Sequence, residues 1–137
     1  MAVLQSTLVG VENNRVDYLA TPQFVGVVLS SAQTGNGDST NTAFRGMRSE
    51  GGAVVITSAI GATPTVTVNI QGSIDGSAWY NVPYSLVATP RTFVLTAITI
   101  TTAVTTTYLL QELVPYQYFK LVYSANTNVT LTATAYL

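Results

Sequence analysis

Few side chains in this sequence could carry out acid–base or nucleophilic chemistry. The 137 residues contain no Cys, no His and only six carboxylates. Without Cys and His, the thiolate nucleophile, the commonest general base and the commonest zinc ligands are all missing. Two carboxylates flanking a glycosidic bond can hydrolyse it, but no two of these six form a suggestive local pair. We therefore expect no catalytic site, no cofactor and no metal centre.

Two acidic residues lie in segments whose glycines predict local structure. Residues 33–41 (QTGNGDSTN) form a polar stretch that predicts a mobile surface loop. Asp38 is its one carboxylate, which is too little charge for tight calcium binding, and the closing Glu of a calcium loop is absent. Asp75 precedes Gly76, and this pair predicts a tight turn, which accounts for Asp75 without a chemical role.

The low charge of the chain excludes several classes of protein. The sequence has 11 formal charges and a net charge of −1, and charged residues make up 8% of it, against about 25% in a typical soluble domain. This balance does not suit a nucleic-acid binder, and no apolar run approaches the ~20 residues of a membrane helix. The first ten residues have no basic region and no long apolar run, so we expect no secretory signal there. Two explanations remain open: a surface coated with neutral polar side chains, or a subunit largely covered by neighbours.

The charges are concentrated in the first 50 residues, which hold seven of the 11. We therefore interpret residues 1–137 as one domain with a less regular, more charged N-terminal region at about 1–50. Arginines suit ion pairs with a protein partner, and a solvated loop is the alternative for the Arg45–Arg48 region. Charge and strand alternation together select the following partner-binding candidates: Glu12, Arg15, Asp17, Tyr18, Arg45, Arg48, Tyr118 and Lys120.

The composition favours β-strands, because 22 Thr and 18 Val residues make β-branched side chains dominant. Period-two alternation and turn residues predict strands at residues 3–11, 23–31, 53–60, 65–72, 92–101, 104–113, 116–124 and 129–137. The turn between the third and fourth lies at residues 61–64. About eight short strands without a convincing helix predict an all-β antiparallel sandwich or a barrel. A jelly roll of two four-stranded sheets is the leading topology, and its strand order is left open.

Alternation also assigns the faces of the aromatic-rich segment 116–124. It places Phe119, Leu121 and Tyr123 on one face, which we expect in the core. Tyr118 and Lys120 then face outward, toward solvent or a neighbouring subunit.

Two segments carry a resemblance to a known class of protein. Residues 66–83 read VTVNIQGSIDGSAWYNVP, and residues 115–137 read PYQYFKLVYSANTNVTLTATAYL. This pattern resembles that of small bacteriophage virion proteins and is most similar to capsid decoration (cement) proteins of the jelly-roll type. The resemblance implies a non-enzymatic virion protein that is made in the host cytoplasm and lies on the capsid exterior. It also implies binding to the major capsid protein and self-association as a dimer or trimer.

The run from Ser73 to Trp79 also resembles a hairpin of discoidin-like carbohydrate-binding domains. In both families the Trp packs inward and Asp-Gly makes the turn, so the run indicates a sandwich more than a ligand. The alternative function is therefore a carbohydrate-binding module of a phage tail or fibre, and a tail-tube or neck subunit is a third possibility. The disulfide of discoidin-like domains is absent here, because the chain has no Cys.

Overall fold

The computed structural model describes residues 26–40, 42–43, 52–110 and 116–136. Every helix or strand element within these ranges is a β-strand, and the strand pairs are antiparallel. In this part of the chain, no helix is long and apolar enough to cross a membrane. The expected strand at 3–11 and most of the charged N-terminal region lie outside the described residues.

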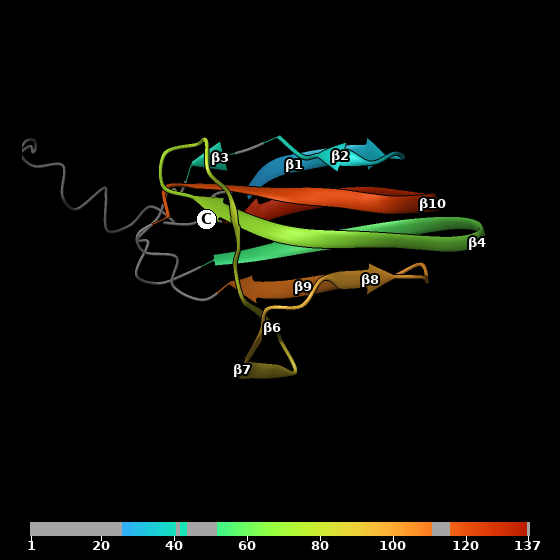
Figure 1. The fold of residues 1–137 in the computed structure, drawn as a ribbon. Coiled ribbons are helices and arrows are strands. Elements are labelled where there is room, and N and C mark those ends of the chain that lie inside the picture. The colour runs from blue at the N-terminus through green and yellow to red at the C-terminus, as the bar shows by residue number, and fades with distance from the viewer. Residues whose placement is uncertain (1–25, 41, 44–51, 111–115, 137) are drawn as a thin grey trace, which may run out of the picture.

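Two long strands, β4 (Gly52–Ser73) and β10 (Tyr118–Tyr136), pair along their whole length to form an antiparallel ribbon. The register shifts on both sides of Thr127, and there the ribbon turns back on itself (Figure 1). Irregularities of this kind interrupt the ladder and let paired strands bend sharply. Residues with positive φ mark the bend: Thr63 (43°), Ala125 (51°) and Asn128 (54°).

The bend divides the strands into two layers. The first layer contains, in order, β1 (Gly26–Gln33), residues 129–136 of β10, residues 52–60 of β4, and β9 (Thr105–Leu110). The second layer contains β2 (Gly37–Asp38) with β3 (Thr42–Ala43), residues 118–124 of β10, residues 65–73 of β4, and β8 (Ile98–Ile100).

This arrangement is a jelly roll. We count β2 and β3 as one segment and each half of β4 and of β10 as one segment. Together with β1, β8 and β9 this gives eight segments, which we number along the chain. The first layer then has the order 1-8-3-6 and the second the order 2-7-4-5, in which antiparallel pairs wrap together around one core. The expected all-β antiparallel sandwich of about eight strands is confirmed. The structure also supplies the strand order.

The core lies between the layers and follows the alternation of the strands. Val66, Val68 and Ile70 of β4, in the second layer, are buried, as expected. Leu131 of β10, in the first layer, is buried with them. A buried hydrogen bond of 2.7 Å joins the hydroxyls of Ser30 in the first layer and Tyr123 in the second. Burial raises the pKa of Tyr123, which keeps this hydroxyl protonated.

Three short strands are inserted between the fourth and fifth segments of the jelly roll. They are β5 (Tyr80–Asn81), β6 (Tyr84–Leu86) and β7 (Thr89–Val94). β6 pairs with β9, and β7 pairs with β6, so this hairpin extends the first layer beyond β9 (Figure 1).

Three expectations need correction. The segments 53–60 and 65–72 are not separate strands but parts of β4, and the strands expected at 116–124 and 129–137 are likewise represented by one strand, β10, because each strand bends and continues where a turn was expected. Residues 92–101 are not one strand: β7 ends at Val94 and β8 begins at Ile98, because β7 pairs with β6 whereas β8 pairs with β4. The segment 33–41 is not a loop throughout, because it contains β2, which pairs with residues 122–123 of β10. A polar two-residue strand carries no hydrophobic alternation, so its pairing with a distant strand leaves no local signal.

We predict that Leu121→Ala lowers the free energy of unfolding by about 2–5 kcal/mol, because Leu121 is fully buried between the layers. Chemical denaturation measures this change. The control is Val28→Ala on β1, where the side chain is 59% exposed and a change within about 0.5 kcal/mol is expected. Equal losses in the two variants would contradict the placement of the core.

Candidate interaction surface

The structure describes two of the eight predicted contact residues, and both face outward on β10. Tyr118 is 37% exposed, whereas the neighbouring Phe119 and Leu121 are fully buried. The assignment of faces along residues 118–123 is therefore confirmed. The other six candidates lie outside the described residues: Glu12, Arg15, Asp17, Tyr18, Arg45 and Arg48.

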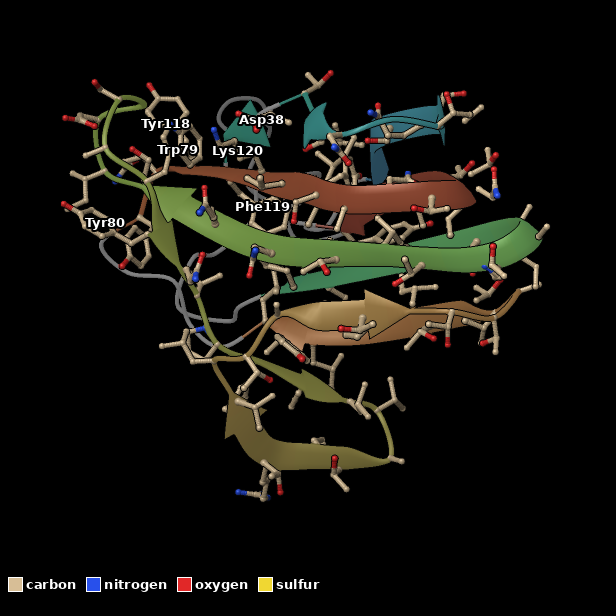
Figure 2. The ribbon with its side chains drawn as sticks, turned by 45° about the vertical axis from the view of Figure 1, so that its right-hand side comes forward. Asp38, Trp79, Tyr80, Tyr118, Phe119 and Lys120 are labelled. Atoms are coloured by element: carbon tan, nitrogen blue, oxygen red, sulfur yellow. The ribbon has the colours of Figure 1, made fainter. Side chains whose placement is uncertain are left out.

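Lys120 connects three parts of the second layer. Its Nζ lies 2.5 Å from Oδ2 of Asp38 on β2 and 4.4 Å from the centroid of the Trp79 ring. The lysine side chain is only 13% exposed, against 51% for Asp38. An ammonium group near an aromatic ring is attracted by the negative face of the π system. Lys120 therefore holds the indole against the outer side of β10 and is itself paired with Asp38 (Figure 2).

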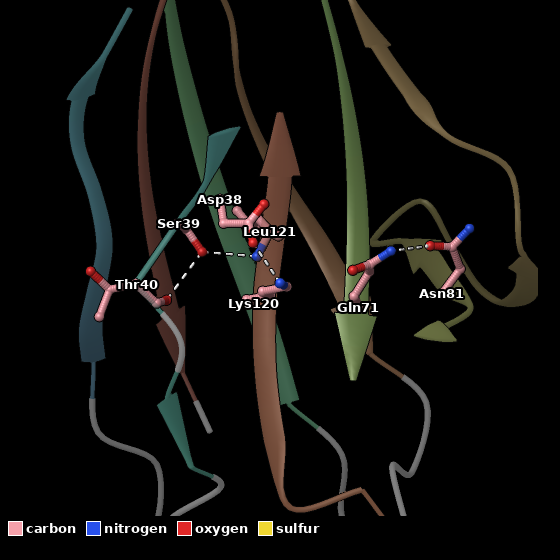
Figure 3. A network of polar contacts seen from close by, with 7 residues as sticks. All are labelled: Asp38, Ser39, Thr40, Gln71, Asn81, Lys120 and Leu121. Carbon is pink, nitrogen blue, oxygen red and sulfur yellow. Dashed lines mark hydrogen bonds and ion pairs between the residues drawn. The ribbon is translucent and has the colours of Figure 1, made fainter. Parts of the chain in front are cut away.

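Asp38 is held in place by the hydrogen bonds of the next residue, Ser39. The Ser39 backbone N–H donates to the Leu121 carbonyl at 2.8 Å, and Ser39 Oγ accepts from the Leu121 N–H at 2.8 Å. Ser39 Oγ also donates to the Thr40 carbonyl at 3.1 Å (Figure 3). These bonds fix the end of β2 beside β10, so the ion pair joins two segments that are already aligned.

A capped turn brings Trp79 to this surface. Asp75 Oδ1 accepts hydrogen bonds from the backbone N–H groups of Ser77 (2.8 Å) and Ala78 (3.0 Å). These bonds, with Ala78 contributing most, hold the pKa of Asp75 below its ordinary value. Gly76 has a φ of 79°, which a residue without Cβ adopts at little cost. The expected Asp-Gly turn is therefore present.

The expectation that Trp79 packs inward is wrong. Trp79 is only partly buried, does not belong to the core cluster, and carries Lys120 over its ring. The capped turn after β4 displaces the following residues from the alternation of the strand, so an apolar side chain need not enter the core there.

A row of polar side chains extends this surface across neighbouring strands. Lys120 on β10 lies opposite Gln71 on β4, and Gln71 lies opposite Asn81 on β5. The Gln71 amide donates to Asn81 Oδ1 at 3.0 Å (Figure 3). Tyr80, next to Asn81, is 55% exposed but lies opposite Gly72, so its side chain is on the other face of the sheet. We call Asp38, Trp79, Tyr118 and Lys120 the aromatic–lysine patch (Figure 2).

The chemistry of this patch is that of a binding surface. Of the described carboxylates, Asp38 forms an ion pair and Asp75 caps its turn. No group of three or more His, Cys, Asp or Glu side chains occurs among the described residues. The patch instead offers aromatic faces and hydroxyls, a neutralised cation and amide groups, which suit contact with a protein or a sugar.

Sequence reasoning missed several members of this surface. Asp38 was assigned to a mobile loop, and its partner Lys120 lies 82 residues away along the chain. Only the strand register brings the two together, so no spacing in the sequence reveals the pair. Sequence reasoning also missed an exposed apolar stretch at residues 86–95, which contains Leu86, Val87, Phe93, Val94 and Leu95.

Comparisons with known proteins give one informative result, a likeness of fold. No protein-family model matches the sequence, and no curated protein sequence matches it. Among solved structures, the chain is similar to the SPBc2 prophage-derived protein YomS, with a TM-score of 0.55 and 9% sequence identity. The match covers 85% of this chain and 96% of that chain. At this identity the likeness is one of fold.

We predict that acid destabilises the native protein less in Asp75→Asn than in the original chain. Because the folded-state pKa of Asp75 is lowered, its contribution is present above the ordinary value of about 3.8 and is lost as pH falls through the lowered value. Melting temperatures measured between about pH 7 and pH 2 test this. The other carboxylates are the same in both proteins, so a smaller fall in the variant isolates Asp75; parallel curves would contradict the cap.

We predict that Lys120→Met changes the fluorescence of Trp79, the only Trp in the chain, and lowers stability by about 0.5–1 kcal/mol. Met keeps an unbranched side chain but removes the ion pair and the cation–π contact. Emission spectra and denaturation curves measure both effects. Lys120→Arg is the matched control, because guanidinium can pair with Asp38 and lie over the indole. An unchanged spectrum and stability in Lys120→Met would refute the contact.

Proposed function

We propose that this chain is a non-enzymatic structural protein of a bacteriophage, which binds the major capsid protein on the outside of the head and stabilises the virion shell. The observation that carries the proposal is the number of large hydrophobic side chains left exposed. Twelve of them are exposed among the described residues, on a chain with 11 formal charges. Apolar surface beside few charges favours association with other protein surfaces.

The fold and the comparison support the same proposal. A jelly roll presents broad β surfaces, and the structurally similar YomS is described as prophage-derived. Uncharged side chains cost less to desolvate than ions, so a Thr-rich outer surface suits extensive contact with neighbouring subunits. A protein that binds only the assembled shell stabilises that shell by mass action.

In this proposal the aromatic–lysine patch contacts the capsid. Tyr and Trp are enriched in protein interfaces because they combine apolar area with a polar group. Lys120 is already paired with Asp38, so covering the patch does not bury an isolated charge. Glu12, Arg15, Asp17, Tyr18, Arg45 and Arg48 are further proposed contacts, and self-association as a dimer or trimer completes the proposal.

A second function, binding of carbohydrate by a phage tail or fibre, is favoured by one feature of the same surface. Trp79 lies beside Lys120, and Lys120 lies opposite Gln71 of the amide pair Gln71–Asn81; aromatic faces with amides form sugar sites. The Tyr84–Tyr108 pair, however, meets edge to face at 87°, so these two rings do not form a flat platform.

We predict that the protein is found in the head fraction of virions produced from the genome that encodes it. Particles purified by density gradient are separated into heads and tails, and mass spectrometry identifies the chain in each. Heads from a strain lacking the gene then test recombinant protein by co-sedimentation. Tyr118→Ala combined with Lys120→Ala is expected to weaken binding at least tenfold, and Val28→Ala serves as the exposed control.

The same assay tests Arg45→Ala combined with Arg48→Ala, which is also expected to weaken binding. Absence of the protein from virions would overturn the proposal. Its presence only in tails, with specific hits on a glycan array, would favour the carbohydrate function instead.

A further inference from the structure

The β6–β7 hairpin extends the first layer beyond the point where the second layer ends. Tyr84 and Leu86 lie opposite Leu110 and Tyr108 of β9, and both β9 residues belong to the core. Residues directly opposite each other in a sheet share a face, so the inner face of the hairpin continues the core-facing side of the first layer. Among the described residues, the second layer ends at β8, which pairs only with β4.

No described strand therefore covers the inner face of the hairpin, and a groove of about 310 Å³ lies between it and β8. Its lining includes Leu86, Val94, Ile98 and Tyr108 and contains no charged residue. All six residues of β7 are exposed, with Val94 at 39%. Figure 1 shows β6 and β7 projecting from the body of the sandwich.

We propose that the inner face of the β6–β7 hairpin is a self-association surface, on which the same hairpin of a second copy supplies the missing second layer. A two-fold axis lets each hairpin cover the other, because the surface meets its own equivalent. The inference deepens the self-association part of the proposed function by naming its surface.

The distribution of charge on the hairpin favours a second copy of the chain as the occupant of this face. Along β7, Thr89, Thr92 and Val94 line the groove, and the charged Arg91 does not. Two inner faces therefore meet without bringing like charges together. Every side chain that lines the groove is uncharged, so an uncharged occupant is complementary to it, and the groove-lining side of the same hairpin in a second copy has this property.

The alternative of pairing edge to edge through β7 is disfavoured by the same strand. Pro90 has no N–H to donate, and pairing of two β7 edges would bring two copies of Arg91 to one seam. An edge protected in this way leaves the apolar face of the hairpin as the surface to be covered.

Sedimentation equilibrium of the full chain over a range of concentrations tests the proposal. We expect a dimer whose dissociation constant rises at least tenfold in Val94→Glu, because the two-fold axis places two carboxylates in the groove. Val104→Glu is the matched control, since Val104 is 42% exposed and lies outside the groove. Circular dichroism checks that both variants remain folded.

Disulfide trapping gives a second readout that does not depend on destabilising the hairpin. The chain has no Cys, so Thr92→Cys introduces one thiol on the inner face, and mild oxidation is expected to trap a covalent dimer. Thr132→Cys, at an exposed position of β10, is expected to stay monomeric on a denaturing gel.

Each negative result would overturn a different part of the proposal. A dimer unaffected by Val94→Glu and not trapped through Thr92→Cys would overturn this surface while leaving self-association intact. A chain that is monomeric at high micromolar concentration would overturn self-association itself. A trimer would overturn the two-fold pairing, and none of these results bears on capsid binding through the aromatic–lysine patch.

Discussion

The continuous pairing of β4 with β10 is the constraint on which the rest of this structure depends. Because the two strands stay hydrogen-bonded on both sides of the bend, neither can turn without the other. Their shared bend converts one ribbon into the central strands of two layers. β1 and β2 then add to the β10 side, whereas β9 and β8 add to the β4 side. Closing the chain over one core follows from that single bend.

The bend also explains why a chain with so few charges has distinct inner and outer surfaces. Alternation along the ribbon sends Val and Leu side chains between the layers and Thr, Asn and Gln side chains outward. Threonine suits this outer position because its branched Cβ favours the strand while its hydroxyl remains hydrated. Water therefore contacts mainly neutral hydroxyl and amide groups on the outer surface. The exposed hydrophobic side chains lie among these groups.

The sequence predicted those features of the fold that depend on period-two alternation. The sequence predicts the two halves of β4 and the two faces of residues 118–123, because burial of one face imposes the pattern; at 61–64 the structure has a bend within one strand where a turn was expected. β2 was missed because its position depends on Ser39 and backbone pairing with β10. The outward position of Trp79 and its contact with Lys120 were also missed, because a capped turn interrupts the alternation. Contacts that depend on the strand register between distant segments produce no recognisable residue spacing in the sequence.

The two proposed contact surfaces share no residue and are compatible with each other. The aromatic–lysine patch belongs to the second layer and its adjoining turn, where Lys120 faces away from the core. The groove lies between the hairpin, which extends the first layer, and β8 of the second layer, and it shares no residue with the patch. Occupation of one surface therefore does not cover the other, so a pair of copies joined through their hairpins would still present two patches. Such a pair would bind a repetitive partner such as a capsid at two points, and each contact could be individually weak because linked sites raise the effective concentration of the second one.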